Sequence, residues 1–293
     1  MYLTGFADEA AKGLADQIRA TKELGWTNIE SRAIDGVNIH DLDDAAFDAA
    51  ASLLEESGIK VNCFGSAIAN WGKKIDSEED FQKDLAQVER AIPRMQRLGS
   101  KLIRIMSYAV LPDRGPEDQM EQERFRRVRE ITKRFLDAGI QPVHENCMNY
   151  GGMGWPYTLR LLENVPGLKL VFDTGNPVFT LDRSKPEPCP FESAWEFYEH
   201  VRDAVVYVHI KDGIRKPDGK HEFVWCGEGL GDVERICADL FKRGYDGGFS
   251  MEPHLAVVFH DASVQSSDEI RYSNYVEYGR RFENILRKVG YKL

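Results

Sequence analysis

The sequence predicts an α/β fold, a single (β/α)8 TIM barrel domain over residues 1–293. Two observations predict it. Apolar stretches with strand character alternate with amphipathic stretches rich in Leu, Glu, Lys and Arg along the whole chain, and eight such units fit the usual size of a closed barrel. No Pro-, Gly- or Ser-rich linker divides the chain. An open doubly wound sheet is the rival, but no Gly-x-Gly-x-x-Gly motif follows the first strand, which disfavours it.

Each element can be placed in order along the chain. Strands are expected at 2–6, 28–30, 60–63, 102–105, 142–145, 168–173, 205–210 and 248–252. Helices are expected at about 10–24, 43–57, 79–98, 119–138, 155–164, 191–203, 232–243 and 268–289. Five of the helices end at a glycine shortly before a strand, namely Gly25, Gly58, Gly99, Gly139 and Gly244. Glycine adopts the left-handed cap without steric cost, so each glycine indicates a helix end, a short loop and a new strand.

Charge and composition exclude several classes of partner. Lys and Arg total 38 against 48 Asp and Glu, a net charge of -10, whereas nucleic-acid binding depends on cationic contacts to phosphate. Neither nucleic acid nor a membrane is an expected partner, because no apolar run approaches the roughly 20 residues of a membrane span. Residues 1–9 show no signal-peptide pattern, and five scattered cysteines without a Cys-x-x-Cys pair fit free thiols. We therefore expect a cytoplasmic protein.

Four consecutive strands end in residues of the kind that bind metal ions. They are the fifth to eighth strands, whose carboxyl ends lie on the face of a barrel that carries active sites. The candidate ligands are Glu145, Asp173, His209 and Glu252. Each alone could be a solvent-facing charge, but together they favour one divalent cation, since oxygen ligands predominate and no thiolate is present. Mn²⁺ is the first choice, with Mg²⁺, Co²⁺ or Zn²⁺ as alternatives.

Residues beside these ligands are candidates for substrate contacts. The alternation of side chains along a strand puts Lys211 on the same side as His209, where it could polarise a substrate oxygen. By the same rule His144 points away from Glu145 and packs beneath a helix, although a curled strand end would make it a second base.

Other polar and aromatic residues have two interpretations each. Glu30 and Arg32 end the second strand on one face, and Arg104 interrupts the fourth, so these charges either pair with one another inside the barrel or contact a substrate hydroxyl. His254 lies just beyond Glu252 and either binds substrate or orients the metal ligands. Three tryptophans on loops after strands are either walls for a sugar ring or packing residues, namely Trp71, Trp155 and Trp225.

Five motifs carry a family resemblance when taken as a set. They are His144-Glu145-Asn146, Phe172-Asp173-Thr174-Gly175-Asn176, Val208-His209-Ile210-Lys211-Asp212, Gly227-Glu228-Gly229-Leu230-Gly231-Asp232 and Met251-Glu252-Pro253-His254. The chain resembles, over nearly its whole length, the xylose isomerase-like barrels, which include ketose 3-epimerases, hydroxypyruvate isomerases and inosose dehydratases. The resemblance implies that the four strand-end ligands bind one divalent metal and that Glu145 and Glu252 also act as acid and base. Ketose 3-epimerases usually have a histidine where this chain has Asn176, which is a further candidate for a substrate contact.

The expected chemistry follows from the ligand set. A hydroxy-ketone bound through its carbonyl and hydroxyl oxygens has an acidified C–H between them, because the cation stabilises the developing enediolate. Glu145 and Glu252 would remove and return the proton on opposite faces. We expect a metal-dependent isomerase or epimerase of a keto-sugar or polyol, active in carbohydrate metabolism. The alternative is a lyase, an inosose-type dehydratase or a keto-glycoside eliminating or hydrating enzyme, which Asn176 and His144 favour.

Two further alternatives are weaker. An apurinic-site endonuclease would need more zinc ligands and a cationic face, and a sugar-binding barrel would not need a complete ligand set. Phosphorylated substrates are not indicated either, because Glu228 and Asp232 would repel phosphate from the glycine loop at 227–231. A homo-oligomer is compatible with the sequence.

Overall fold

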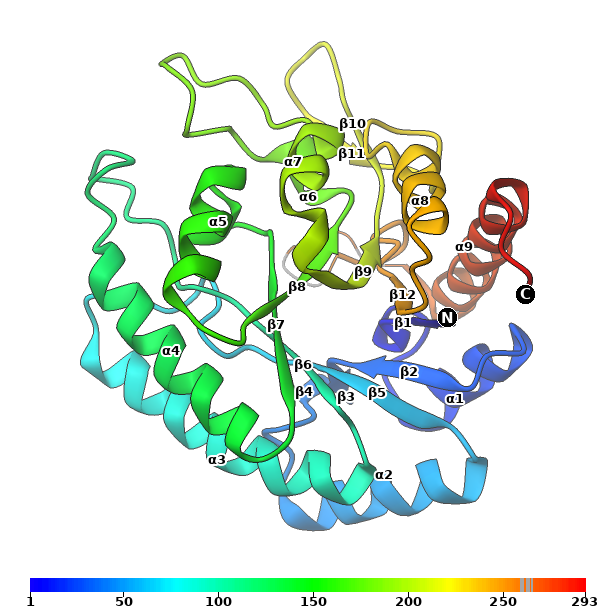
Figure 1. Cartoon of the computed structure of the whole chain (residues 1–293). Coiled ribbons are helices and arrows are strands. Elements are labelled where there is room, and N and C mark those ends of the chain that lie inside the picture. The colour runs from blue at the N-terminus through cyan, green and yellow to red at the C-terminus, as the bar shows by residue number, and fades with distance from the viewer. Residues whose placement is uncertain (259–260, 262–263, 265) are drawn as a thin grey trace.

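Eight parallel strands form the barrel, and helices surround it (Figure 1). The computed structural model describes residues 1–258, 261, 264 and 266–293. Around the sheet the strands are β1 (Tyr2–Gly5), β12 (Gly248–Met251), β9 (Val205–Ile210), β8 (Lys169–Asp173), β7 (Gln141–Glu145), β6 (Leu102–Ile105), β5 (Lys60–Gly65) and β2 (Asn28–Ser31). An isolated parallel bridge between Phe6 and Glu30 joins the two ends of the sheet. The (β/α)8 barrel predicted from the sequence is confirmed.

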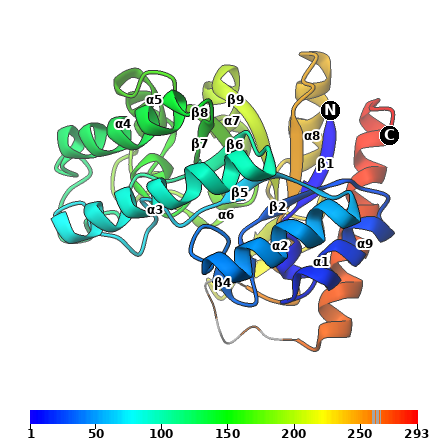
Figure 2. The same cartoon turned by 90° about the horizontal axis from the view of Figure 1, so that it is seen from below.

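The outer helices lie where the sequence predicts them. They are α1 (Leu14–Glu23), α2 (Asp44–Ser57), α3 (Glu78–Leu98), α4 (Glu121–Asp137), α5 (Trp155–Asn164), α7 (Ala194–Val201), α8 (Val233–Lys242) and α9 (Asp268–Val289). The five predicted cap glycines all have φ between 70° and 74°, so each marks a left-handed turn after a helix. The two termini lie close together beside α8 and α9 in both views (Figure 1, Figure 2).

Short elements that the sequence did not predict follow several strands. They are η1 (Ala7–Glu9), the hairpin of β3 (Ala33–Ile34) and β4 (Val37–Asn38), η2 (Tyr150–Gly152), α6 (Asn176–Phe179), η3 (Arg202–Ala204), and the hairpin of β10 (Gly213–Arg215) and β11 (His221–Phe223). Each is too short to show a repeating apolar pattern. Except for η3, which precedes β9, these elements follow the carboxyl ends of strands and so build the face that carries the candidate site.

A buried apolar layer fills the barrel beneath the candidate ligands. It contains Cys63, Val143, Val171 and Tyr207, one each from β5, β7, β8 and β9. Side chains alternate along a strand, so the residues two positions further on also point inward, and three of them are candidate ligands. Among the described residues, no helix combines the length and apolar character needed to cross a membrane.

Candidate metal centre and cleft

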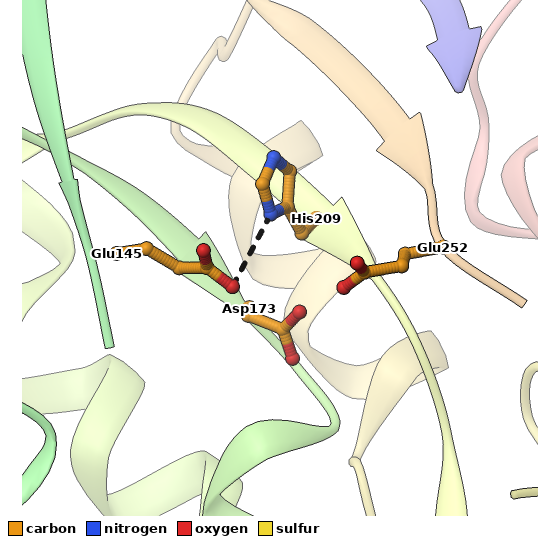
Figure 3. Close-up of side chains that lie close together, drawn as sticks. All are labelled: Glu145, Asp173, His209 and Glu252. Atoms are coloured by element: carbon orange, nitrogen blue, oxygen red, sulfur yellow. Dashed lines mark ion pairs between the residues drawn. The ribbon is translucent and has the colours of Figure 1, made fainter. Parts of the chain in front are cut away.

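The four predicted ligands lie together at the carboxyl ends of their strands. Glu145 ends β7, Asp173 ends β8, His209 is the fifth residue of β9, and Glu252 directly follows β12. One donor atom from each lies within 4.8 Å of the others, and all four residues are buried. Figure 3 shows Glu145 and Glu252 reaching the centre from opposite sides, with Asp173 and His209 between them.

His209 is oriented by a residue on the opposite side of the barrel. Its Nε2 lies 3.0 Å from Oε2 of Glu30, which also accepts a 2.8 Å hydrogen bond from the hydroxyl of Tyr207. Its Nδ1 therefore faces the centre, 3.7 Å from Oε1 of Glu145 (Figure 3). Burial lowers the pKa of His209, but the carboxylates of Glu30 and Glu145 outweigh burial and raise it to about 10.

Each glutamate of the centre has an arginine partner. Arg104 Nη1 lies 3.1 Å from Oε2 of Glu145, and Arg32 Nη1 lies 2.6 Å from Oε1 of Glu252. Burial alone would raise both carboxyl pKa values. The charges of Arg104 and His209 instead hold the pKa of Glu145 at about 2, and Lys211 leads the charges that hold the pKa of Glu252 well below its ordinary range. Both side chains are therefore ionised at neutral pH.

Asp173 presents one oxygen to the centre. Its Oδ1 accepts hydrogen bonds from the backbone N–H groups of Gly175 at 2.8 Å and Asn176 at 2.7 Å. Its Oδ2 has no hydrogen-bond partner, although Lys211 Nζ lies 3.1 Å away. Burial raises the pKa of Asp173 more than Lys211 lowers it.

The donor set fits a divalent cation. Asp173 Oδ2 and His209 Nδ1 are both buried without a hydrogen-bond partner, which costs free energy unless another group satisfies them. A cation among the four residues would satisfy both atoms and compensate the three carboxylates. One imidazole and three carboxylates suit Mn²⁺, Mg²⁺ and Zn²⁺.

The charges Glu30, Arg32 and Arg104, for which the sequence suggested pairing with one another, have other partners. Glu30 contacts His209, Arg104 contacts Glu145, and Arg32 contacts Asp8 as well as Glu252. Asp8 and Glu9 lie on η1 and were missed in the sequence, although two acidic residues directly after the first strand are a visible signal. Glu30 and Arg104 also attract one another through their charges, so the pairing expected from the sequence is found in part, beside these ion pairs with residues on other elements.

Four of the predicted substrate contacts line a cavity of about 230 Å³ above the ligands. They are Arg104, Asn176, Lys211 and His254, and the cavity also contacts Trp71, Glu145 and Glu252. The amide of Asn176 donates a 3.0 Å hydrogen bond to Oε1 of Glu145. These predicted residues therefore line the same cavity as two of the four candidate metal ligands.

His144 and Trp155 do not line this cavity. His144 points away from Glu145, and its Nε2 lies 3.0 Å from both Ser107 Oγ and Asn149 Oδ1. Trp155 starts α5 and stacks on His200 of α7, with ring centroids 3.9 Å apart. Neither side chain is thus placed to contact a substrate in this cavity. The structure agrees instead with the outward orientation that strand alternation predicts for His144 and with the packing interpretation of Trp155.

The glycine loop has a structural partner. The carboxylate of Asp212 accepts hydrogen bonds from the backbone N–H groups of Gly227, Gly229 and Gly231 at 2.8 to 3.0 Å. These three N–H groups already donate to Asp212, so they are not available to bind a phosphate.

A family model described as xylose isomerase-like TIM barrel matches residues 18–272. Among curated proteins, no match is found. Many solved structures share the fold, and three of them at low identity are the following.

The IolI protein with a bound zinc atom has a TM-score of 0.76 and 15% identity, covering 100% of both chains. The 3-keto-D-glucoside 4-epimerase YcjR from E. coli has a TM-score of 0.64 and 17% identity, covering 96% of this chain and 99% of its own. The probable 3-DHS dehydratase AsbF from Bacillus anthracis has a TM-score of 0.65 and 17% identity, covering 94% of this chain and 97% of its own.

Proposed function

Because the chain belongs to the xylose isomerase-like TIM barrel family, we propose that it is a divalent-metal-dependent isomerase or epimerase of a keto-sugar or polyol. The observation that carries this proposal is the meeting of Glu145, Asp173, His209 and Glu252 at one buried point beneath a cavity. YcjR, a 3-keto-D-glucoside 4-epimerase with the same fold, supports this substrate class.

The proposed metal is Mn²⁺, with Mg²⁺, Co²⁺ and Zn²⁺ as alternatives. Glu145, Asp173, His209 and Glu252 would hold it, and the zinc in the IolI structure supports a divalent ion in a barrel of this kind. When bound, the metal supplies positive charge that stabilises negative charge on the substrate oxygens.

The two glutamates carry the proton transfer. Both are ionised, so either can remove the proton from the carbon next to the substrate carbonyl. Return of that proton to the neighbouring carbon gives isomerisation. Delivery of a proton on the opposite face by the other glutamate, once that residue has taken up a proton from solvent, gives epimerisation. Lys211 Nζ, 2.7 Å from Glu252, stays charged and can polarise a substrate oxygen. Arg104 and Arg32 hold the two carboxylates in position.

A lyase is the second candidate, favoured by Asn176. This residue donates to Glu145 at the position where ketose 3-epimerases usually have a histidine, and the dehydratase AsbF has the same fold. His144 no longer supports the lyase, because it is directed away from the cavity.

Solvent exchange tests the proposal. The Mn²⁺-loaded protein is incubated in deuterated buffer with 3-keto-D-glucose and with ketohexoses, and exchange of the C–H next to the carbonyl is followed by NMR. Glu145→Gln and Glu252→Gln should each abolish exchange, whereas Glu163→Gln on the exposed face of α5 should not. Exchange that persists in both active-site variants would contradict the two-glutamate assignment. If the product is an enone, detected by its ultraviolet absorbance, and not an epimer, the protein is a lyase.

A further inference from the structure

A second cavity of about 580 Å³ adjoins the metal-facing cavity of about 230 Å³. Four residues line both, namely Met148, Asn176, Lys211 and His254. The two are therefore the inner and outer compartments of one cleft. The outer compartment has more than twice the volume of the inner one, and it falls in the size range of pockets that bind small organic ligands.

The walls of the two compartments differ in chemistry. The inner compartment has charged walls, including Arg32, Arg104 and Lys211. The outer compartment has an aromatic wall built by α6 and β11, where the rings of Phe179 and Phe223 lie 5.0 Å apart at 79°. Further apolar residues complete it, namely Leu255, Val258 and Val264.

His254 joins the two compartments. Its backbone has a φ of 54°, which is uncommon for a residue other than glycine, and Glu9 holds both its N–H and its ring Nδ1 at 2.8 Å. Its ring lies 4.9 Å from Phe223 in an edge-to-face arrangement, and its Nε2 lies 3.7 Å from Glu252 Oε1. The side chain that Glu9 holds thus contacts both a candidate metal ligand and the aromatic wall, so this wall lies directly beside the inner compartment.

We propose that the substrate is a glycoside with an aromatic aglycone, whose keto-sugar ring occupies the inner compartment and whose aglycone packs against Phe179 and Phe223. This inference rests on the proposed function and specifies its substrate. An aromatic ring gains both from leaving water and from edge-to-face contact with these two side chains. A second sugar ring would also need partners for its hydroxyls. Of the polar residues that line only the outer compartment, Thr180 is half-buried, and His221, Glu222 and Asp261 are exposed to water.

Binding of glucosides without a ketone tests the compartment apart from turnover. Calorimetry on the Mn²⁺-loaded protein compares p-nitrophenyl β-D-glucoside, methyl β-D-glucoside and cellobiose. We expect the aryl glucoside to bind at least about tenfold more tightly than the other two. Similar affinity for all three, or tighter binding of cellobiose, would overturn the proposal.

Variants locate the aglycone. Phe223→Ala and the milder Phe179→Leu should each remove most of the aryl preference, expressed as the ratio of aryl to methyl affinity. Phe191→Ala is the matched control, because Phe191 belongs to the same aromatic group, 5.7 Å from His221, but lines neither compartment. The assignment would be overturned if the ratio of aryl to methyl affinity is unchanged in folded Phe223→Ala and Phe179→Leu. It would also be overturned if Phe191→Ala lowers this ratio as much as they do.

The failure of this inference is distinguishable from failure of the proposed function. If the protein prefers aryl glucosides but exchanges no proton of any keto-glucoside, the aglycone compartment stands and the isomerase or epimerase proposal is refuted. Proton exchange without an aryl preference would refute the compartment assignment alone.

Discussion

The Nζ atom of Lys211 lies 2.7 Å from Oε2 of Glu252, a candidate metal ligand. The same Nζ lies 3.1 Å from Oδ2 of Asp173, a second ligand. Burial disfavours the ammonium charge, but Asp173 and Glu252 keep the pKa of Lys211 above its ordinary value. A fixed positive charge of the chain therefore contacts two of the carboxylates that a metal would use, and the two cations compete for them.

Removing this charge should strengthen metal binding. In Lys211→Met we expect the Kd for Mn²⁺ to fall by about tenfold, which corresponds to about 1.4 kcal/mol, while kcat falls because the charge that could polarise a substrate oxygen is lost. Calorimetry gives the Kd, and Lys133→Met on the exposed face of α4 serves as the control. Weaker Mn²⁺ binding in Lys211→Met would mean that the ammonium supports the ligands and does not compete with the metal.

Glu30 should control metal affinity although it is not a ligand. Its carboxylate fixes the ring of His209 by accepting a hydrogen bond from Nε2–H, which leaves Nδ1 for the metal. Carboxylates in this position typically contribute 10–100-fold to metal affinity. We therefore expect Glu30→Gln to raise the Kd for Mn²⁺ by about that factor with the fold retained. Tyr207→Phe, which removes the other hydrogen bond to Glu30, should have a smaller effect in the same titration.

The eight strands and the outer helices were predictable from the periodicity of apolar residues and from the glycines that end the helices. The alternation of side chains along a strand also predicted correctly that His209 and Lys211 point inward and that His144 points outward. These signals are local in the chain.

Contacts between distant residues were not predictable in the same way. Arg32 reaches Glu252, 220 residues away, and Glu9 reaches His254, 245 residues away. Barrel closure brings these pairs together, and nothing in the neighbouring sequence indicates which charge pairs with which. The outer compartment was missed for a related reason, because its wall combines a four-residue helix with a three-residue strand.

Asp212 should stabilise the glycine loop. Asp212→Ala would leave the backbone N–H groups of Gly227, Gly229 and Gly231 without their acceptor. Hydrogen bonds to a charged group contribute about 1.5–3 kcal/mol each, and an unsatisfied buried donor costs a similar amount, so we expect a loss of at least about 2 kcal/mol. Urea unfolding measures it. Asp218→Ala, in the exposed turn between β10 and β11, should change stability by less than about 0.5 kcal/mol. A loss in Asp212→Ala no larger than in this control would show that the loop does not depend on the carboxylate.

Glu192 should make a contribution to the stability of the folded protein that is lost as pH rises. Its side chain is buried, its Oε1 has no hydrogen-bond partner, and burial together with nearby Asp182 raises its pKa well above the ordinary value of 4.5. Above pH 4.5 the unfolded chain releases the proton of Glu192, while the folded chain retains it. The contribution of protonated Glu192 to stability is therefore lost progressively between pH 4.5 and the folded-state pKa.

Glu192→Gln stays neutral at every pH and should remove this dependence. Relative to the unsubstituted protein, its Tm should be similar at pH 4 and higher at pH 8, by about 2–4 °C for each kcal/mol recovered. Differential scanning calorimetry at several pH values measures the difference. Glu187→Gln changes an exposed glutamate of the same loop and should leave the pH dependence unaltered. A Tm difference between Glu192→Gln and the unsubstituted protein that does not grow between pH 4 and pH 8 would show that Glu192 ionises in the folded state at its ordinary pKa, through relaxation of the loop around Asp182.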